Sequence, residues 1–149
     1  MLGSLAKWLR IFGYDTVYPD AMTNDDEILK SAKSEERLLL SRDKELIQRA
    51  KKALIPVLEI HTTELSEQLA EVLTRIPPDK KVILSRCTLC NTPLVSVEKK
   101  NVQAFVPEKV FRNRDDFWFC PMCKKYYWMG THYENMMKKI NKLLSKGTL

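Results

Sequence analysis

A chain of 149 residues, 44% of them hydrophobic, fits one globular unit or a small domain with an appended module, and it excludes a large multidomain enzyme. Its 30% charged residues, 4 glycines and 7 prolines exclude a disordered tail or a fibrous repeat, and its apolar runs are too short to span a membrane. The net charge of +6 lies in the second half, because residues 1–80 carry 12 Lys and Arg against 14 Asp and Glu, whereas residues 81–149 carry 13 against 5.

The N-terminal residues form the first predicted helix, with apolar side chains at helical spacing over residues 2–12 and Gly13 as a helix stop. They lack the pattern of a signal peptide, since Lys7 and Arg10 stand inside the apolar pattern and no small-residue cleavage site follows. We therefore expect a cytoplasmic protein. In that reducing compartment, cysteines are not expected to form structural disulfides.

After this helix, strands and helices alternate, and a capping-box pattern, Thr23-x-x-Asp26, opens the second helix. We predict strands at 16–18, 38–40 and 56–60, and further helices at 23–32, 43–52 and 62–76. This order predicts an α/β fold with a parallel sheet covered by helices. Three strands are few for such a sheet, and the first helix precedes all of them.

The loops that follow the three strands contain most of the candidate site residues of the first half. Ligands of parallel sheets bind beyond the carboxyl ends of the strands. The polar residues in these loops are Asp20, Asp25, Asp26, Asp43, His61 and Glu64. Carboxylates at one rim suit magnesium or manganese, which prefer oxygen ligands. In the alternative interpretation, Asp25 and Asp43, which stand where helices begin, cap free backbone N–H groups.

Two C-x-x-C knuckles, Cys87-Thr-Leu-Cys90 and Cys120-Pro-Met-Cys123, are separated by 29 residues in the basic half. Four thiolates arranged in this way complete a tetrahedron around zinc and leave no position for water, which is typical of a structural site. We therefore predict a zinc ribbon, with a hairpin at 94–98 and a loop through Pro107. A mononuclear iron site would use the same ligands, and a redox dithiol is the remaining alternative.

Aromatic and basic residues surround the second knuckle, a mixture that suits base stacking and phosphate neutralisation. The candidate contacts to nucleic acid there are Lys124, Lys125, Tyr127, Trp128 and His132. Alternatively, the rings pack around the metal or against the first domain, and His132 is a packed or hydrogen-bonded side chain. Residues 135–146 are predicted to form a basic amphipathic helix.

Two arginines near the expected rim, Arg10 and Arg42, are further candidates for contact with phosphate, unless they are solvated or ion-paired. Pro77-Pro78-Asp79 interrupts the pattern between the halves, so we predict a first domain at 1–80 and a second at 81–149. The positive charge of the second domain is typical of a partner that carries phosphate, although basic surfaces also serve solubility.

Six elements together resemble the Mut-seven C-terminal RNase domain family, a PIN-like fold with an attached zinc ribbon. The elements in the first half are Met1-Leu2-Gly3-x-Leu5-Ala6-x-Trp8-Leu9-Arg10-x-x-Gly13-Tyr14-Asp15-Thr16, Asp25-x-x-Ile28-Leu29-x-x-Ala32 and Arg37-Leu38-Leu39-Leu40-Ser41-Arg42-Asp43. Those in the second half are Arg86-Cys87-x-x-Cys90-Asn91, Phe117-Trp118-x-Cys120-Pro121-x-Cys123 and Tyr127-Trp128-x-Gly130-x-His132. The resemblance covers nearly the whole chain.

The resemblance implies a metal-dependent ribonuclease with a PIN-like three-layer sheet, in which Asp25 and Asp43 occupy the positions that hold magnesium or manganese. It also implies a strand ending in an aspartate before the Met-Leu-Gly element, and the sequence begins at Met1 without that strand. We therefore expect hydrolysis of RNA, with zinc on the four cysteines and RNA gripped by the basic half. The alternative is a catalytically degenerate module that binds RNA, ribosomal RNA or the ribosome; a DNA-binding zinc ribbon would leave the first eighty residues without a task.

Overall fold

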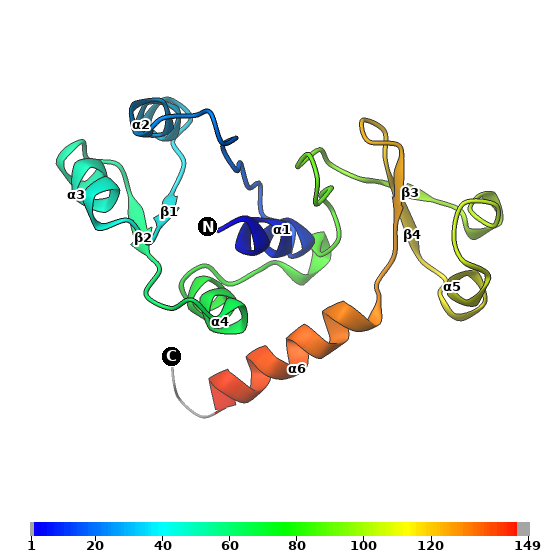
Figure 1. Ribbon diagram of the computed structural model, residues 1–149. Coiled ribbons are helices and arrows are strands. Elements are labelled where there is room, and N and C mark those ends of the chain that lie inside the picture. Colours follow the sequence, from blue (N-terminus) through cyan, green and yellow to red (C-terminus); the bar gives the residue numbers. More distant parts are fainter. Residues whose placement is uncertain (1, 146–149) are drawn as a thin grey trace.

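The protein contains two sheets that differ in strand direction and lie in different halves of the chain (Figure 1). A computed structural model describes residues 2–145, so Met1 and Lys146, at the ends of predicted elements, lie outside the described residues. Strands β1 (Leu39–Ser41) and β2 (Val57–Glu59) are parallel, whereas β3 (Val95–Val97), β4 (Phe117–Cys120) and β5 (Lys125–Tyr127) form an antiparallel sheet in that order. The mixed α/β class is thereby confirmed.

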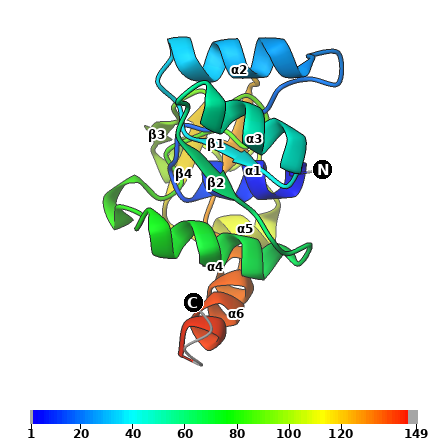
Figure 2. The ribbon, with the colours of Figure 1, turned by 90° about the vertical axis from the view of Figure 1, so that its left-hand side faces the viewer.

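The first half contains four helices around the parallel pair, close to the predicted positions. They are α1 (Gly3–Ile11), α2 (Asp25–Ser34), α3 (Lys44–Lys52) and α4 (Leu65–Arg75). Helix α3 connects β1 to β2, as a parallel pair requires. Buried Ala32 of α2 and Ala50 of α3 pack with Leu39 of β1, and Figure 2 shows these two helices beside the two strands.

The strand predicted at 16–18 is wrong, because residues 14–20 form neither a helix nor a strand. The backbone of Thr16 bonds to side chains instead of a neighbouring strand. Its carbonyl accepts from Arg10 Nε at 2.9 Å, and its N–H donates to Asn91 Oδ1 at 3.0 Å. The β-propensity of this short segment therefore yields to partners from α1 and the first knuckle.

Helices α1, α2 and α3 end in the same hydrogen-bonding pattern, with a left-handed residue just past the last turn. Glu36 and Leu54 occupy that position after α2 and α3, with φ of 54° and 60°. After α1 the residue is Gly13, with φ of 92°, and a Cβ atom there would overlap the backbone carbonyl of Val82. A glycine is required at this point because both the conformation and the close approach exclude a side chain.

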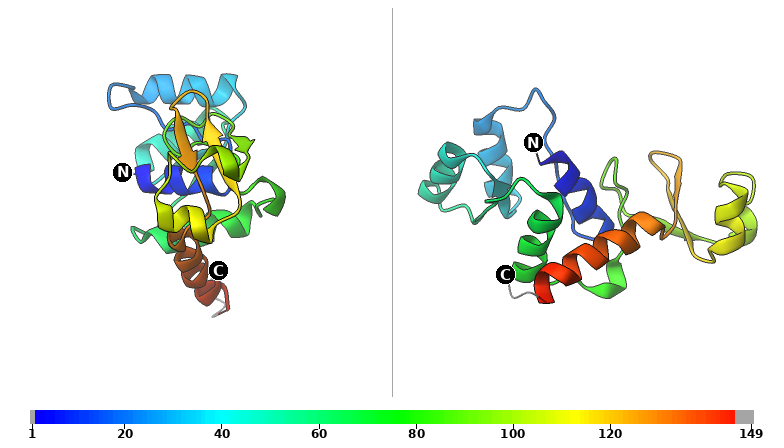
Figure 3. Two further views of the ribbon diagram at one scale, coloured as in Figure 1. Left: turned by 90° about the vertical axis from the view of Figure 1, so that its right-hand side faces the viewer. Right: turned by 60° about the horizontal axis from the view of Figure 1, so that its bottom comes forward.

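The main core of the protein joins the first half to the C-terminal helix α6 (Thr131–Ser145). Ile140 of α6 is 1% exposed and lies in one cluster with Leu5, Phe12 and Leu69. Helix α6 begins before the predicted residue 135 and runs from the antiparallel sheet back to α4 (Figures 1 and 3). Its apolar face is therefore buried against the first half, while the boundary at residue 80 stays a prediction.

The segment that we call the ribbon, residues 84–128, holds both knuckles and strands β3 to β5. Residues 94–98 do not form the predicted hairpin, since β3 pairs with the distant strand β4, with Val95 opposite Phe119. The predicted loop through Pro107 contains a short helix, α5 (Glu108–Asn113). This helix belongs to a small core around Val102 and Phe117. Its apolar residues do not predict a helix by themselves, and packing on this core orders them. None of the helices described is long and apolar enough to cross a membrane.

Candidate functional site

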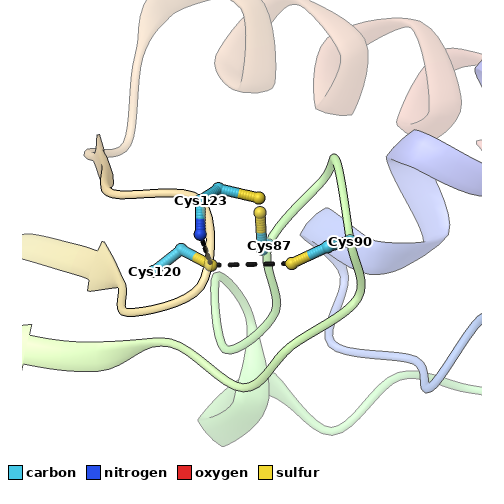
Figure 4. Close-up of side chains that lie close together, drawn as sticks. All are labelled: Cys87, Cys90, Cys120 and Cys123. Carbon is cyan, nitrogen blue, oxygen red and sulfur yellow. Dashed lines mark hydrogen bonds between the residues drawn. The ribbon is translucent and has the colours of Figure 1, made fainter.

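The four cysteine thiols meet at one point between the two knuckles (Figure 4). Their Sγ atoms all lie within 4.8 Å of one another, and those of Cys90 and Cys120 are 3.6 Å apart. A zinc tetrahedron with Zn–S bonds of about 2.3 Å has sulfur atoms about 3.8 Å apart, so the cluster fits this ion. Cys87 and Cys120 are fully buried. The predicted grouping of the four cysteines is confirmed, and the site can hold zinc.

Each knuckle forms a backbone turn, and the two turns are of the same kind. This explains how two short loops present their sulfurs to a common point. The N–H of Asn91 donates to Cys87 O at 2.9 Å, and the N–H of Lys124 donates to Cys120 O at 2.8 Å. Asn91 and Lys124 are both left-handed, with φ of 69° and 58°. In the second knuckle, the Cys123 N–H also points to Cys120 Sγ at 3.3 Å and favours its thiolate.

The crowded thiols shift one another's protonation. A hydrogen bond with Thr92, whose Oγ1 lies 3.1 Å away, lowers the pKa of Cys90 to about 6. Contact with Cys90 raises the pKa of Cys123 to about 12, and burial raises the pKa of Cys120. The four thiols therefore do not all ionise at neutral pH without a cation, and a divalent ion stabilises the fully ionised set.

Tyr127 packs against the cysteine cluster. It does not lie on the surface, as a contact to nucleic acid predicted from the sequence would require. Its side chain is buried, with the hydroxyl 3.0 Å from Cys87 Sγ and 3.2 Å from the backbone N–H of Thr88. Burial raises the pKa of Tyr127 to about 12, so the hydroxyl keeps its proton and can donate it to the Cys87 sulfur. The ring is unavailable for stacking on a base.

Arg10 also occupies a structural position, which corrects the expectation that it contacts phosphate. The residue is 8% exposed, and its guanidinium donates to Thr16 O at 2.9 Å and Thr88 O at 2.8 Å. Buried charged groups are tolerated only when they are hydrogen-bonded in this way. Arg10 therefore joins α1 to the loop of the first knuckle.

A second link between the halves, which the sequence analysis missed, centres on Asp15. Its carboxylate accepts from Asn91 Nδ2 at 2.7 Å and lies 3.3 Å from Arg37 and 3.8 Å from Arg86. The Asn91 hydrogen bond, followed by the two arginines, lowers the pKa of Asp15. Only the sequence motif Tyr14-Asp15-Thr16 marked this region, and nothing in it indicates a partner some 76 residues away.

A cavity of about 1030 Å³ opens beside β1, between α1, α2, α4 and residues 14–20. Buried apolar side chains such as Leu5 and Val72 line it, together with the exposed residues that follow the carboxyl end of β1, Arg42 and Asp43. Asp20 and Asp25 line the same cavity, whereas Asp26, His61 and Glu64 do not. The structure therefore brings together three of the five acidic residues predicted at this rim, along with Arg42.

Asp43 caps helix α3, as the alternative interpretation expects. Its Oδ1 accepts from the N–H groups of Glu45 at 2.9 Å and Leu46 at 3.2 Å. The other carboxylate oxygen, Oδ2, has no hydrogen-bond partner among residues 2–145. One oxygen of Asp43 is thus engaged, and one faces no competing donor.

Asp25 is the first residue of α2 and does not cap it. The cap is Asn24, whose Oδ1 accepts from the Glu27 N–H at 2.9 Å, and Thr23 does not have the role that the capping-box pattern predicts. The Asp25 carboxylate lies 3.9 Å from Arg49, which is also paired with Asp26. Within residues 2–145, the four cysteines alone form a group of at least three ligand atoms within 4.8 Å, so neither Asp25 nor Asp43 belongs to such a group.

The other residues predicted to contact nucleic acid are distributed around the ribbon and the start of α6. Lys124, Lys125 and His132 are exposed, and the Lys125 Nζ lies 5.7 Å from the centre of the Tyr127 ring. Trp128 is half-buried and packs on the small core around Phe117. Three of these side chains are therefore free to contact a ligand.

Comparison with known proteins gives one match. A family model described as Mut7-C RNAse domain matches residues 1–140 of the 149-residue chain. This range contains both knuckles, the Asp25 and Asp43 cavity and α6 as far as Ile140. No curated protein and no solved structure matches.

Proposed function

Because the chain belongs to the Mut7-C RNase domain family, we propose that it is a ribonuclease of the PIN-like class that hydrolyses RNA with magnesium or manganese. The observation that carries this proposal is that Asp25, Asp43 and Arg42 line the same cavity at the carboxyl end of β1. Carboxylate oxygens at the end of a parallel strand are the ligand type that these hard cations prefer. The three-layer arrangement and the cytoplasmic location predicted from the sequence belong to the same proposal.

In this mechanism three residues of the cavity have separate tasks. Asp43 would hold the cation through Oδ2, while Oδ1 caps α3 and fixes the carboxylate. Asp25 provides the second carboxylate, and exposed Arg42 contacts the RNA phosphate. When bound, the ion offsets phosphate charge and activates water for attack on phosphorus.

The ribbon contributes RNA binding in this proposal. Zinc on Cys87, Cys90, Cys120 and Cys123 fixes the two knuckles. Exposed Lys124, Lys125 and His132, with half-buried Trp128, contact the RNA, while Arg10 and Tyr127 hold the ribbon and the first half in position. The charge of +8 over residues 81–149 (13 Lys and Arg against 5 Asp and Glu) supports this division of work.

One observation favours a second candidate, a non-catalytic module that binds RNA or the ribosome. The two carboxylates proposed as metal ligands also serve the fold, Asp43 as a helix cap and Asp25 near Arg49, and neither belongs to a group of three ligand atoms within 4.8 Å in the described part of the chain. Two carboxylates hold a divalent cation weakly. In this case the ribbon keeps its role and the cavity has no catalytic one.

The deciding experiment is cleavage of a labelled single-stranded RNA by the zinc-loaded chain, with and without manganese, while RNA binding is followed in the same samples. Asp43→Asn is the informative variant, because Asn caps helices as well as Asp but lacks the charge that holds a cation. Asp26→Asn is the matched control, since this neighbouring carboxylate lies outside the cavity.

We expect manganese-dependent cleavage that Asp43→Asn abolishes and Asp26→Asn retains, with RNA binding unchanged in both. Equal cleavage by Asp43→Asn and the unmodified chain would overturn the assignment of the cavity. RNA binding without cleavage under any metal condition would favour the second candidate.

A further inference from the structure

One face of the antiparallel sheet carries a row of apolar and aromatic side chains across all three strands. Val95 of β3 lies opposite Phe119 of β4, which lies opposite Tyr126 of β5. Residues directly opposite each other share a face of the sheet. The rings of Phe119 and Tyr126 are in contact, with centroids 4.8 Å apart.

Phe105 extends this row beyond the sheet from the turn that follows η2 (Lys99–Asn101). Its ring stacks on Tyr126, with centroids 5.1 Å apart and an interplanar angle of 13°. The side chain is nevertheless 64% exposed, so one ring face packs on Tyr126 and the opposite face is open to solvent. Tyr126 thus contacts two rings, tilted against Phe119 and stacked on Phe105.

The outer end of this row lies outside the core of the ribbon. Buried Val102, Val106 and Phe117 form that core, and Val97, Phe111 and Tyr126 pack against it. Phe105 and Val95, at 64% and 47% exposed, lie outside it. A contiguous exposed group that includes a large aromatic side chain is a feature of binding surfaces.

The surroundings of the row are positively charged. Residues 93–106 and 118–127, which contain it, include four lysines and a single acidic residue, a balance of +3; these are Lys99, Lys100, Lys124, Lys125 and Glu98. Lys99 is paired with Asp115 and Lys100 with Glu98, whereas Lys124, at the end of the β4–β5 hairpin, is exposed and has no ion pair within the described residues. An open aromatic face on a segment of positive charge matches a ligand that offers flat rings and negative charge together.

We propose that Phe105 is a stacking platform for single-stranded RNA, on whose open face an unpaired base continues the Tyr126–Phe105 stack. Lys124, at the end of the β4–β5 hairpin, then contacts a phosphate, whereas Lys125 lies on the opposite face of the sheet, over the Tyr127 ring. Single strands are required, because bases within a duplex are already stacked on one another. This inference rests on the proposed function for RNA as the partner, and it adds the strandedness and a residue absent from the predicted contacts.

The test is fluorescence anisotropy with the full, zinc-loaded chain and no added magnesium or manganese, so that binding is measured without cleavage. Two probes of equal length are used, a labelled unstructured oligoribonucleotide and its abasic counterpart, which has the phosphates but no bases. Phe105→Ala removes the platform and Phe105→Trp enlarges it. Leu54→Ala is the control, because this leucine is 90% exposed and lies at the end of α3.

We expect Phe105→Ala to bind the RNA about tenfold more weakly, within the range found for removal of one stacking residue. Phe105→Trp and Leu54→Ala should bind it as the unmodified chain does, and all four proteins should bind the abasic probe equally. A misfolded variant would lose both probes, which separates folding from stacking.

Unchanged RNA affinity of Phe105→Ala, with normal binding by the unmodified chain, would overturn the platform and leave the proposed function intact. Self-association of the chain that Phe105→Ala abolishes, again without a change in RNA affinity, would assign the row to a protein contact and also overturn it. If the unmodified chain binds neither probe, the RNA role of the ribbon fails together with the platform.

Discussion

The cysteine cluster and the acidic cavity are both candidate metal sites, but folding completes them to different degrees. The cysteine cluster brings four sulfur atoms within 4.8 Å of one another. In the cavity, one oxygen of Asp43 caps a helix and Asp25 lies 3.9 Å from Arg49. The cysteines have no competing structural role, whereas each carboxylate is also used by the fold.

This difference follows from ligand chemistry. A thiolate is a poor partner for backbone N–H groups and arginines compared with a metal ion, so clustered cysteines indicate a metal almost by themselves. A carboxylate is a good helix cap and a good partner for arginine, so its position near a helix start is consistent with several roles. The comparison therefore predicts that the ribbon depends on its metal for structure, while the first half does not.

The largest effect is expected from Cys87→Ser, which removes one buried ligand of the cluster. Structural zinc contributes on the order of 10 kcal/mol to the folding of small modules, so the ribbon should lose both its zinc and its fold. Zinc content and tryptophan fluorescence check this, since Trp118 packs beside the cluster. Asp25→Ser is the matched change in the cavity and should leave both readouts as they are; equal effects of the two variants would remove the distinction.

Acid should weaken zinc binding by the cysteine cluster. Zinc requires the ionised thiols, and the most acidic of them, Cys90, has a pKa of about 6. As the pH falls through this value, protons compete for all four sulfurs, so zinc affinity falls and becomes more steeply dependent on pH. Competition with a chromophoric chelator across this range measures the change. A constant affinity from pH 7 to about 5 would contradict the assignment of the cluster as a thiolate site.

The contact between the end of α1 and the segment that leads into the ribbon is expected to tolerate no side chain at Gly13. Substitution with Ala places a Cβ against the carbonyl of Val82 and strains a φ of 92°, so the free energy of unfolding should fall by more than about 2 kcal/mol. Gly130→Ala provides the control, because its Cβ would meet only Trp128 at 3.8 Å. Urea unfolding of both variants tests this, and equal stability would show that this contact is flexible.

Asp43 allows its two tasks in the cavity to be measured separately. Asp43→Ala removes the cap of α3 and should lower the free energy of unfolding by about 1 kcal/mol, whereas Asp43→Asn, which retains the cap, should change it little. If Asp43 also holds the cation, both variants lose RNA cleavage although only one loses stability. Equal stability of the Ala and Asn variants would contradict the capping role.

The sequence predicts the parts of this molecule whose partners are near in sequence or whose chemistry is specific. The apolar spacing of α1 and α4 and the spacing within each knuckle are sufficient for a correct prediction. The strand expected at 16–18 failed because Arg10 and Asn91 compete for its backbone. That competition depends on a contact across 75 residues, which local propensity does not contain.

The same reasoning explains which site residues the sequence misplaced. Arg10 and Tyr127 have the charge and the ring that suit RNA, but burial assigns them to hydrogen bonds with carbonyl oxygens and with the Cys87 sulfur. Phe105 has no motif around it and becomes notable only because Tyr126 orients its ring and leaves one face open. Residue type therefore indicates what a side chain can do, and packing decides whether it is free to do it.

The smallest expected effect concerns one of the contacts between the first half and the ribbon, the hydrogen bond between Asp15 and Asn91 at 2.7 Å. Asp15 is about half exposed, so the pair should contribute no more than about 1 kcal/mol. A double-mutant cycle of Asp15→Ala with Asn91→Gly measures it, since glycine keeps the left-handed turn of the first knuckle.

The control cycle pairs Asp15→Ala with Lys124→Gly, the corresponding position of the second knuckle. Coupling in the first cycle alone would show that the first knuckle, but not the second, is energetically connected to the segment that lines the acidic cavity, because Asp15 itself lies in that lining. Zero coupling in both would mean that the two sites fold side by side without energetic connection through this contact.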